Sequence, residues 1–137
     1  MNITQKQVNQ IAYDIVGCAI EVHKELGPGL LESVYEKCLI EEIKSCGYKV
    51  FSQVPVPIHY KGRLLDQKLK LDLLVNDLVI VELKAVESVL PVFEAQLLTY
   101  LKLAKKPKGL LINFHCKNIV RQMVPLVTEQ FSNLDEN

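Results

Sequence analysis

The sequence has no tryptophan, only 7% aromatic residues, and no net charge from its sixteen basic and sixteen acidic side chains. Its apolar runs break after a few residues, far below the ~18 to 20 needed to cross a bilayer, so we expect no membrane partner. Residues 1–10 are polar and lack the apolar core of a secretory signal, which predicts a cytoplasmic protein. Because the charges cancel, any anionic partner must be held by a local basic surface.

The sequence also lacks the close cysteine spacings of zinc and redox motifs. None of its four cysteines forms a C-x2-C pair, and two lie on expected buried helix faces, which favours reduced, structural thiols. The histidines are scattered, and we assign none of them as a metal ligand. These residues are Cys18, Cys38, Cys46, Cys116, His23, His59 and His115.

What is present fits one domain. The 137 residues, 49% of them hydrophobic, are enough for one packed core but not for two, so we expect a single domain over residues 1–137. Apolar residues at steps of three and four predict helices from Thr4 to Leu26, from about Leu30 to Gly47, and from Pro91 to Lys105. The second helix is expected to bury Leu31, Val34, Tyr35 and Leu39, and the polar tail 132–137 to fray.

Between the second and third helices the sequence is typical of β-strands. Residues 48–51, 54–60, 64–75 and 78–84 read as strands, followed later by 109–114, with 119–124 as a further candidate. Prolines in the 54–60 segment favour an edge or bulged strand. This order predicts an α/β fold with a mixed central sheet of about four to five strands flanked by helices.

Among the charged residues on these strands are Asp72, Glu82 and Lys84, in a setting where charge is uncommon unless it is exposed or used. Glu82 and Lys84 project from one side of their strand, and the hairpin register decides whether Asp72 joins them. A two-residue turn at 76–77 would place Glu82 on the opposite face. A three-residue loop would pair Val75 with Val79, and therefore Asp72 with Glu82 and Lys70 with Lys84. We predict the second register or an equivalent bulge.

Two facing carboxylates repel each other unless a cation lies between them. Oxygen ligands suit Mg2+ or Mn2+, so the pair Asp72 and Glu82 predicts a divalent metal site. Lys84, two residues along, could orient a water or stabilise charge on a phosphate.

These residues belong to a series of motifs in a familiar order. Gly29-Leu-Leu-Glu32-Ser-Val-Tyr35 matches the pattern GxxExxY, and Asp72 followed by Glu82-Leu-Lys84 resembles the signature of the PD-(D/E)xK nuclease superfamily. Further along, Gln96 and Tyr100 resemble its QxxxY helix motif, and residues 109–114 its last core strand. Over roughly residues 10–124 the chain therefore resembles the small prokaryotic family named for the GxxExxY motif.

The resemblance implies a restriction-endonuclease-like core and a metal-dependent nuclease that acts on nucleic acid. It implies no particular substrate, and we expect DNA rather than RNA as the partner. It implies Mg2+ or Mn2+ held by Asp72, Glu82 and Glu32, with Lys84, Glu32 and Gln96 as catalytic residues. The candidate substrate contacts are Lys68, Lys70, Tyr100 and Lys102.

Each of these residues also has a plainer interpretation. Glu32 could simply favour its helix N-terminus, Glu82 and Lys84 could be a solvated strand end, and Gln96 with Tyr100 an ordinary helix pair. Tyr35 is expected to pack in the core with its hydroxyl bonded to a polar group.

Local charge supports the nucleic-acid interpretation. Half of the basic residues lie in the segments 61–70 and 102–108, which would form a phosphate-binding rim if both flanked the site. Many relatives carry arginine where this chain has Lys70, a weaker bidentate phosphate ligand. An inactive binding or regulatory module with the nuclease fold therefore stays open, as does a homodimer or a subunit of a larger complex.

Overall fold

The computed structural model describes residues 2–137. The chain forms helices and strands in the following order: α1 (Gln5–Leu26), α2 (Glu32–Ser45), β1 (Val50–Tyr60), β2 (Arg63–Val75), β3 (Val79–Lys84), α3 (Pro91–Ala104), β4 (Lys108–Asn113), β5 (Val124–Val127) and α4 (Glu129–Ser132).

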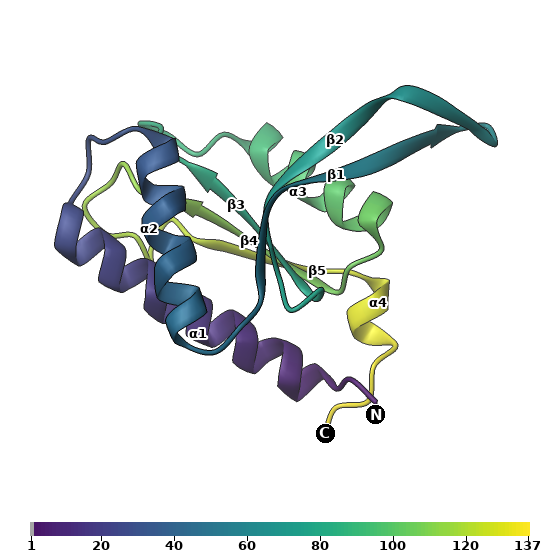
Figure 1. The fold of residues 1–137 in the computed structure, drawn as a ribbon, viewed down its shortest axis with the longest axis horizontal. Helices are drawn as coiled ribbons and strands as arrows, with labels where there is room; N and C mark the ends of the chain where they lie inside the picture. Colours follow the sequence, from purple (N-terminus) through teal and green to yellow (C-terminus); the bar gives the residue numbers. More distant parts are fainter. Residues whose placement is uncertain (1) are drawn as a thin grey trace.

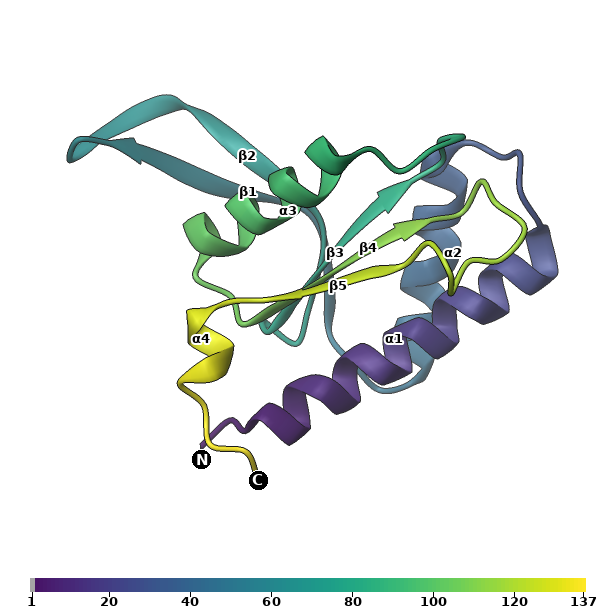
Figure 2. The same ribbon diagram turned by 180° about the vertical axis from the view of Figure 1, so that it is seen from behind.

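The strands form one five-stranded sheet in the order β1-β2-β3-β4-β5. Strands β3 and β4 are parallel because α3 crosses between them, and the other neighbours are antiparallel. Helices α1 and α2 cover one face of the sheet and α3 covers the other (Figures 1 and 2). The expectation of a mixed sheet flanked by helices is confirmed.

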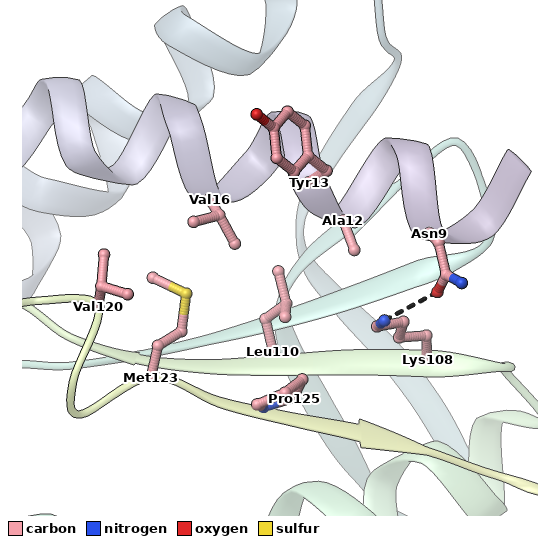
Figure 3. Close-up of a pocket in the computed structure, with 9 residues that line it drawn as sticks. All are labelled: Asn9, Ala12, Tyr13, Val16, Lys108, Leu110, Val120, Met123 and Pro125. Carbon is pink, nitrogen blue, oxygen red and sulfur yellow. Dashed lines mark hydrogen bonds between the residues drawn. The ribbon is translucent and has the colours of Figure 1, made fainter. Parts of the chain in front are cut away.

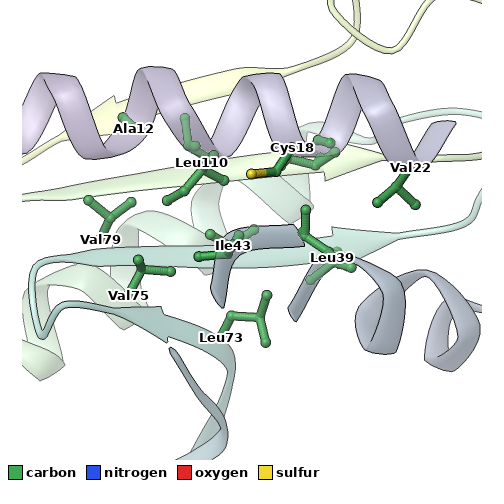
Figure 4. Packing of buried hydrophobic residues seen from close by; sticks show 14 of the residues in the cluster. Ala12, Cys18, Val22, Leu39, Ile43, Leu73, Val75, Val79 and Leu110 are labelled. Atoms are coloured by element: carbon green, nitrogen blue, oxygen red, sulfur yellow. The ribbon is translucent and has the colours of Figure 1, made fainter. Parts of the chain in front are cut away.

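The larger core lies between the sheet and helices α1 and α2. Helix α1 begins with a capping box between Thr4 and Gln7, and its buried stripe packs against α2 and alternate residues of β2, β3 and β4. Figure 4 shows this packing around Leu39, Ile43 and Leu110. Burial of so many aliphatic side chains is the main source of stability for this face.

A smaller core lies under α3. Leu97 and Leu101 of this helix pack on Ile80, Leu111 and their neighbours in the sheet. Helix and strand approach so closely at Gly109 that a Cβ atom there would lie 3.0 Å from Leu101 Cδ1. The glycine therefore sets the spacing between α3 and β4.

Strands β1 and β2 continue beyond the sheet as a two-stranded arm that passes over α3 (Figure 1). We call residues 54–70 the arm. β1 is the outer strand, and its pairing with β2 shifts between Pro57 and His59, so the prediction of an edge strand with an irregularity is confirmed. The arm turns at Lys61 and Gly62, both with positive φ.

Two predictions about the second helix, its first residue and the burial of its first turn, are wrong. Helix α2 begins at Glu32 rather than near Leu30, so Leu31 is its N-cap and is 74% exposed. Val34, in the first turn, is also exposed, because the buried face of α2 runs through Tyr35, Leu39 and Ile43.

The C-terminal region differs from expectation as well. Residues 119–122 form the turn that reverses the chain after β4, and the last strand is Val124–Val127 rather than 119–124. The tail, expected to fray, is hydrogen-bonded to the start of α1: the N–H groups of Gln5 and Lys6 donate to the carbonyls of Asp135 and Glu136 at 2.7 and 3.1 Å. Both chain ends therefore lie together (Figure 1).

Within residues 2–137, no helix combines the length and the apolar character that a membrane crossing requires.

Candidate functional site

The β2–β3 hairpin has the register predicted from the sequence. Val75 pairs with Val79, and the loop between them contains Asn76 and Asp77, both with positive φ. The ladder ends at Leu73 and Val81. Asp72 and Glu82 therefore face each other just beyond the last backbone pair. The expected pairing of Lys70 with Lys84 is wrong, because β2 has by then left β3 to form the arm.

The two carboxylates bridge the gap where the strands separate. The backbone N–H of Asp72 donates to Glu82 Oε1 at 3.1 Å, and the N–H of Leu83 donates to Asp72 Oδ2 at 2.9 Å. Each carboxylate thus accepts a hydrogen bond from a backbone N–H of the facing strand. Each carboxylate has a second oxygen that can serve a ligand.

A bend at the base of the arm accompanies this separation. Gln53, opposite Asp72, has φ of 52° and is missing from the β1–β2 ladder. Leu71 packs in the core under α3, whereas Leu73 packs in the core under α1 and α2. Strict alternation along Leu69 to Val75 would place Leu71 and Leu73 on one apolar face. That prediction is wrong, because the apolar side changes at Asp72.

The charge pair is electrostatically strained. Glu82 is only 5% exposed. Burial, and next the charge of Asp72, raise the pKa of Glu82 to about 8, although the N–H of Asp72 and the ammonium of Lys84 act in the opposite direction. Near neutral pH the buried carboxyl therefore holds a proton unless a cation compensates its charge.

The residues of the GxxExxY pattern build one wall of this site. Gly29 has φ of 101°, which allows the tight loop between α1 and α2. Tyr35 is fully buried and stacks on Phe114 with 4.6 Å between ring centroids. Its hydroxyl donates to the Gly27 carbonyl at 2.6 Å and accepts from the Leu30 N–H at 3.1 Å. The expected role of Tyr35 is confirmed, and it fixes where α2 begins.

Glu32, at the start of α2, is thereby directed toward the carboxylate pair. Partial desolvation and the charge of Asp72 raise the pKa of Glu32, and Lys84 lowers it. Glu36, one turn later, has its pKa raised by burial and by Asp72, and it accepts a hydrogen bond from Gln53 at 2.9 Å. Sequence reasoning missed Glu36, although its spacing of four from Glu32 places both on one helix face.

Lys84 ends β3 on the same side as Glu82. Its ammonium lies 4.6 Å from the centre of the Phe93 ring at the start of α3, which orients the side chain. Next to it in the sheet is Asn113, which is fully buried. The amide of Asn113 bonds both the N–H and the carbonyl of Val86, at 3.0 and 2.8 Å. Asn113 thus fixes the loop between Lys84 and α3.

Asn113 is a second residue that sequence reasoning did not single out. It follows four buried residues without polar side chains, and a buried amide in such a place requires hydrogen-bond partners. A single amide at the end of an apolar strand was therefore the sequence feature that could have identified Asn113.

Helix α3 supplies the opposite wall. Gln96 donates to the Tyr100 hydroxyl at 3.0 Å, as in an ordinary pair four residues apart. Burial, followed by the charges of Glu82 and Asp72, raises the pKa of Tyr100, so its hydroxyl is within electrostatic range of both carboxylates. Lys102 follows Tyr100 by two residues and therefore lies on the other flank of α3.

Only one of the two basic segments lies near the site. The arm joins the sheet at Asp72, so Lys70 and Lys68 lie two and four residues from Asp72 on β2, on the arm side of the site. The segment 102–108 leads to Lys108, which pairs with Val79 at the far end of β3 from Lys84. Lys106 there forms an ion pair with Asp77 at 2.7 Å. The condition for a rim formed by both segments, that each flanks the site, is therefore not met, because the segment 102–108 runs away from the site although it follows the Gln96 motif in sequence.

The donor set can be compared with what a divalent cation requires. No group of three or more His, Cys, Asp or Glu residues within residues 2–137 is arranged to hold a metal ion. Asp72 and Glu82 nevertheless form a pair of facing oxygen donors whose mutual repulsion a cation would relieve. The pair fits Mg2+ or Mn2+ with water completing the coordination, and Glu32 lies near enough to interact with it electrostatically.

A cavity of about 370 Å3 lies elsewhere, between α1 and strands β4 and β5 (Figure 3). Its lining is largely apolar, with Leu110 at its base and Lys108 hydrogen-bonded to Asn9 at one end. It faces α1, whereas Glu82 and Lys84 lie on the side of α3, so it is separate from the carboxylate site.

A mixed sheet with facing carboxylates and a lysine where its strands separate defines a nuclease-like protein. Comparison with known families agrees: the PD-(D/E)XK nuclease superfamily matches residues 9–124. The chain belongs to this superfamily. No curated protein and no solved structure matches it.

Proposed function

We propose that the protein is a divalent-metal-dependent nuclease of the GxxExxY family, which hydrolyses phosphodiester bonds in nucleic acid, with DNA as the expected substrate. The observation that carries this proposal is the separation of β2 from β3, which leaves the carboxylates of Asp72 and Glu82 facing each other beside Lys84. Membership of the nuclease superfamily supports the same class of reaction.

In this proposal Asp72 and Glu82 hold Mg2+ or Mn2+, and Glu32 contributes a further oxygen directly or through water. When bound, the ion supplies Lewis-acid stabilisation of phosphate charge and lowers the pKa of water. Lys84, held over Phe93, stabilises negative charge on the scissile phosphate or orients the attacking water. Gln96, paired with Tyr100, positions the water or the phosphate from the opposite wall.

The arm extends the site along the nucleic acid. Lys68 and Lys70 alternate with Leu69 on β2 and are exposed, so they can contact phosphates next to the scissile one. Tyr100 contributes a hydroxyl near the carboxylates. Lys102 is the weakest of the four proposed contacts because it lies on the other flank of α3. With so few cations, binding should be weak and sensitive to salt.

The experiment is a cleavage assay on purified protein with Mg2+ or Mn2+ and matched DNA and RNA substrates, run beside calorimetry with Mn2+. We expect Asp72→Asn to lose both metal binding and cleavage. Lys84→Ala should lose cleavage but retain metal binding, because the lysine carries no ligand oxygen. Cleavage that survives both substitutions would come from a contaminant and would overturn the proposal.

A second function is favoured by one observation. Backbone N–H groups already bind one oxygen of each carboxylate, and the raised pKa of Glu82 allows the pair to share a proton without metal. A nucleic-acid-binding or regulatory module that has lost turnover would have this arrangement. Duplex binding without Mn2+ binding or cleavage would identify it. Light scattering at several concentrations would show whether a homodimer or larger assembly enlarges the binding surface.

A further inference from the structure

Two thiols meet at a place that the candidate site does not use. Cys18 of α1 and Cys46 at the end of α2 are 28 residues apart in sequence, yet their Sγ atoms lie 3.6 Å apart. Cys18 is buried and Cys46 is exposed. A reagent in solution can therefore reach one sulfur while the other lies in contact beneath it.

We propose that Cys18 and Cys46 form an oxidation site, which a peroxide converts to an intramolecular disulfide and a thiol reductant restores. Within residues 2–137 this is the one pair of cysteines whose sulfurs lie within hydrogen-bond distance. The site does not depend on nuclease activity, so it can be tested whatever the outcome for the carboxylates.

The surrounding structure holds the two sulfurs in place. Helices α1 and α2 share the larger core, where Cys18 lies among buried aliphatic side chains (Figure 4). One turn before Cys18, Asp14 accepts a hydrogen bond from the hydroxyl of Tyr48, two residues after Cys46. The segments that carry the cysteines are thus joined by a second contact, which limits their separation.

The exposed sulfur reacts first. Burial, contact with Cys46, and the nearby carboxylates of Glu42 and Asp14 raise the pKa of Cys18 and keep it as a thiol. The Cys46 thiolate attacks a peroxide oxygen, the O–O bond breaks, and Cys46 sulfenic acid and hydroxide form. The hydroxide takes up the proton that Cys46 released, giving water.

The second step closes the bond. Cys18 sulfur attacks Cys46 sulfur, the S–S bond forms, and the S–O bond breaks. The departing hydroxyl leaves as water with the proton of Cys18. In sum, two thiols and one hydrogen peroxide give one disulfide and two waters, and the peroxide is the oxidant.

The disulfide would link α1 to the C-terminal end of α2, the helix whose first residue is Glu32. It would lower the conformational entropy of the unfolded chain and would link two helices without involving a residue of the sheet. We therefore expect the oxidised protein to melt at a higher temperature than the reduced protein.

The test treats the reduced full chain with hydrogen peroxide and follows free thiols, intact mass, peptide maps and melting temperature. We expect two of the four thiols to disappear, a mass loss of about 2 Da, and a peptide linking Cys18 to Cys46. The melting temperature should rise by several degrees, and dithiothreitol should reverse each change.

Two variants control the result. Cys46→Ser removes an exposed thiol at a helix end and should fold, form no intramolecular bond and show no rise in melting temperature. The double variant Cys38→Ser/Cys116→Ser should still lose its two remaining thiols. Four intact thiols after treatment, a bond between any other pair, or oxygen adducts on single cysteines without a link would overturn the proposal.

Discussion

The two halves of strand β3 differ in almost every respect that matters for function. From Val79 to Val81 the strand pairs with both neighbours and is fully buried and apolar. From Glu82 to Lys84 it keeps its pairing with β4 but loses β2, and two charged side chains flank the buried Leu83. The first half shows how this sheet is stabilised, and the second shows how a stable sheet can hold an unfavourable charge pair in place.

The largest expected effect lies in the second half. Glu82→Gln keeps the size of the side chain and its acceptor oxygen but removes the charge. If Glu82 binds the ion, this variant should lose Mn2+ binding and reduce cleavage at least about a hundredfold, the scale of several kcal/mol of transition-state stabilisation. Calorimetry and initial rates measure the two effects. Unchanged metal affinity in a folded Glu82→Gln protein would contradict the assignment.

The first half should respond in the opposite way. Ile80 is fully buried under α3, two residues before Glu82. Ile80→Ala should lower the free energy of unfolding by about 2 to 5 kcal/mol, because it removes aliphatic contacts and leaves a cavity. Denaturant unfolding measures this cost. Mn2+ affinity at a temperature where the variant is folded should stay near that of the unsubstituted chain, and a parallel loss would show that the halves are not independent.

The pH dependence of stability sharpens the contrast. When a chelator has removed divalent metal ions, the raised pKa of Glu82 means that the folded protein holds a proton on this carboxyl. The unfolded chain releases that proton from about pH 4.5 upward. Stability from this group should therefore be present at low pH and be lost as pH rises through about 8, by at most about 1.4 kcal/mol per pH unit.

The matched control is again Glu82→Gln, which should flatten this part of the profile and be more stable than the unsubstituted chain at alkaline pH. Denaturant midpoints across the range provide the measurement. Identical profiles for the two proteins would mean that the pKa of Glu82 is not raised in the folded protein.

The smallest effect concerns the arm. Lys70→Ala should weaken nucleic-acid binding a few-fold and reduce the slope of log affinity against log salt by about one. Lys6→Ala makes the same change of charge at the start of α1, near the chain termini, and should alter neither quantity. Titration at several salt concentrations measures both. Equal effects of the two substitutions would indicate only a general response to net charge.

Local patterns predicted much of the fold and one decisive feature of the site. Helix periodicity placed α1 and α3 to within a residue or two. The turn at Asn76 and Asp77 left two registers open, and the requirement that the carboxylates share one face selected the register that brings Asp72 opposite Glu82. These features depend on neighbours in sequence, where side-chain direction follows directly from backbone geometry.

The remaining features depend on tertiary contacts. The departure of β2 from β3 is accompanied by the bend at Gln53, whose positive φ has no signal in its residue type. The segment 102–108 looked suitable for a phosphate rim, but the parallel crossover through α3 carries it to the far end of β3. The tail is ordered by hydrogen bonds to α1, a contact between the two ends of the chain that no local pattern encodes.

The central claim is that Asp72 and Glu82 form a divalent metal site where β2 and β3 separate. A crystal of the protein soaked in Mn2+ tests it most directly, because anomalous scattering locates the ion without reference to activity. The account predicts a peak within ligand distance of both carboxylates and close to Glu32. A well-ordered site at millimolar Mn2+ with no peak between the two side chains, or with the ion bound elsewhere, would contradict it.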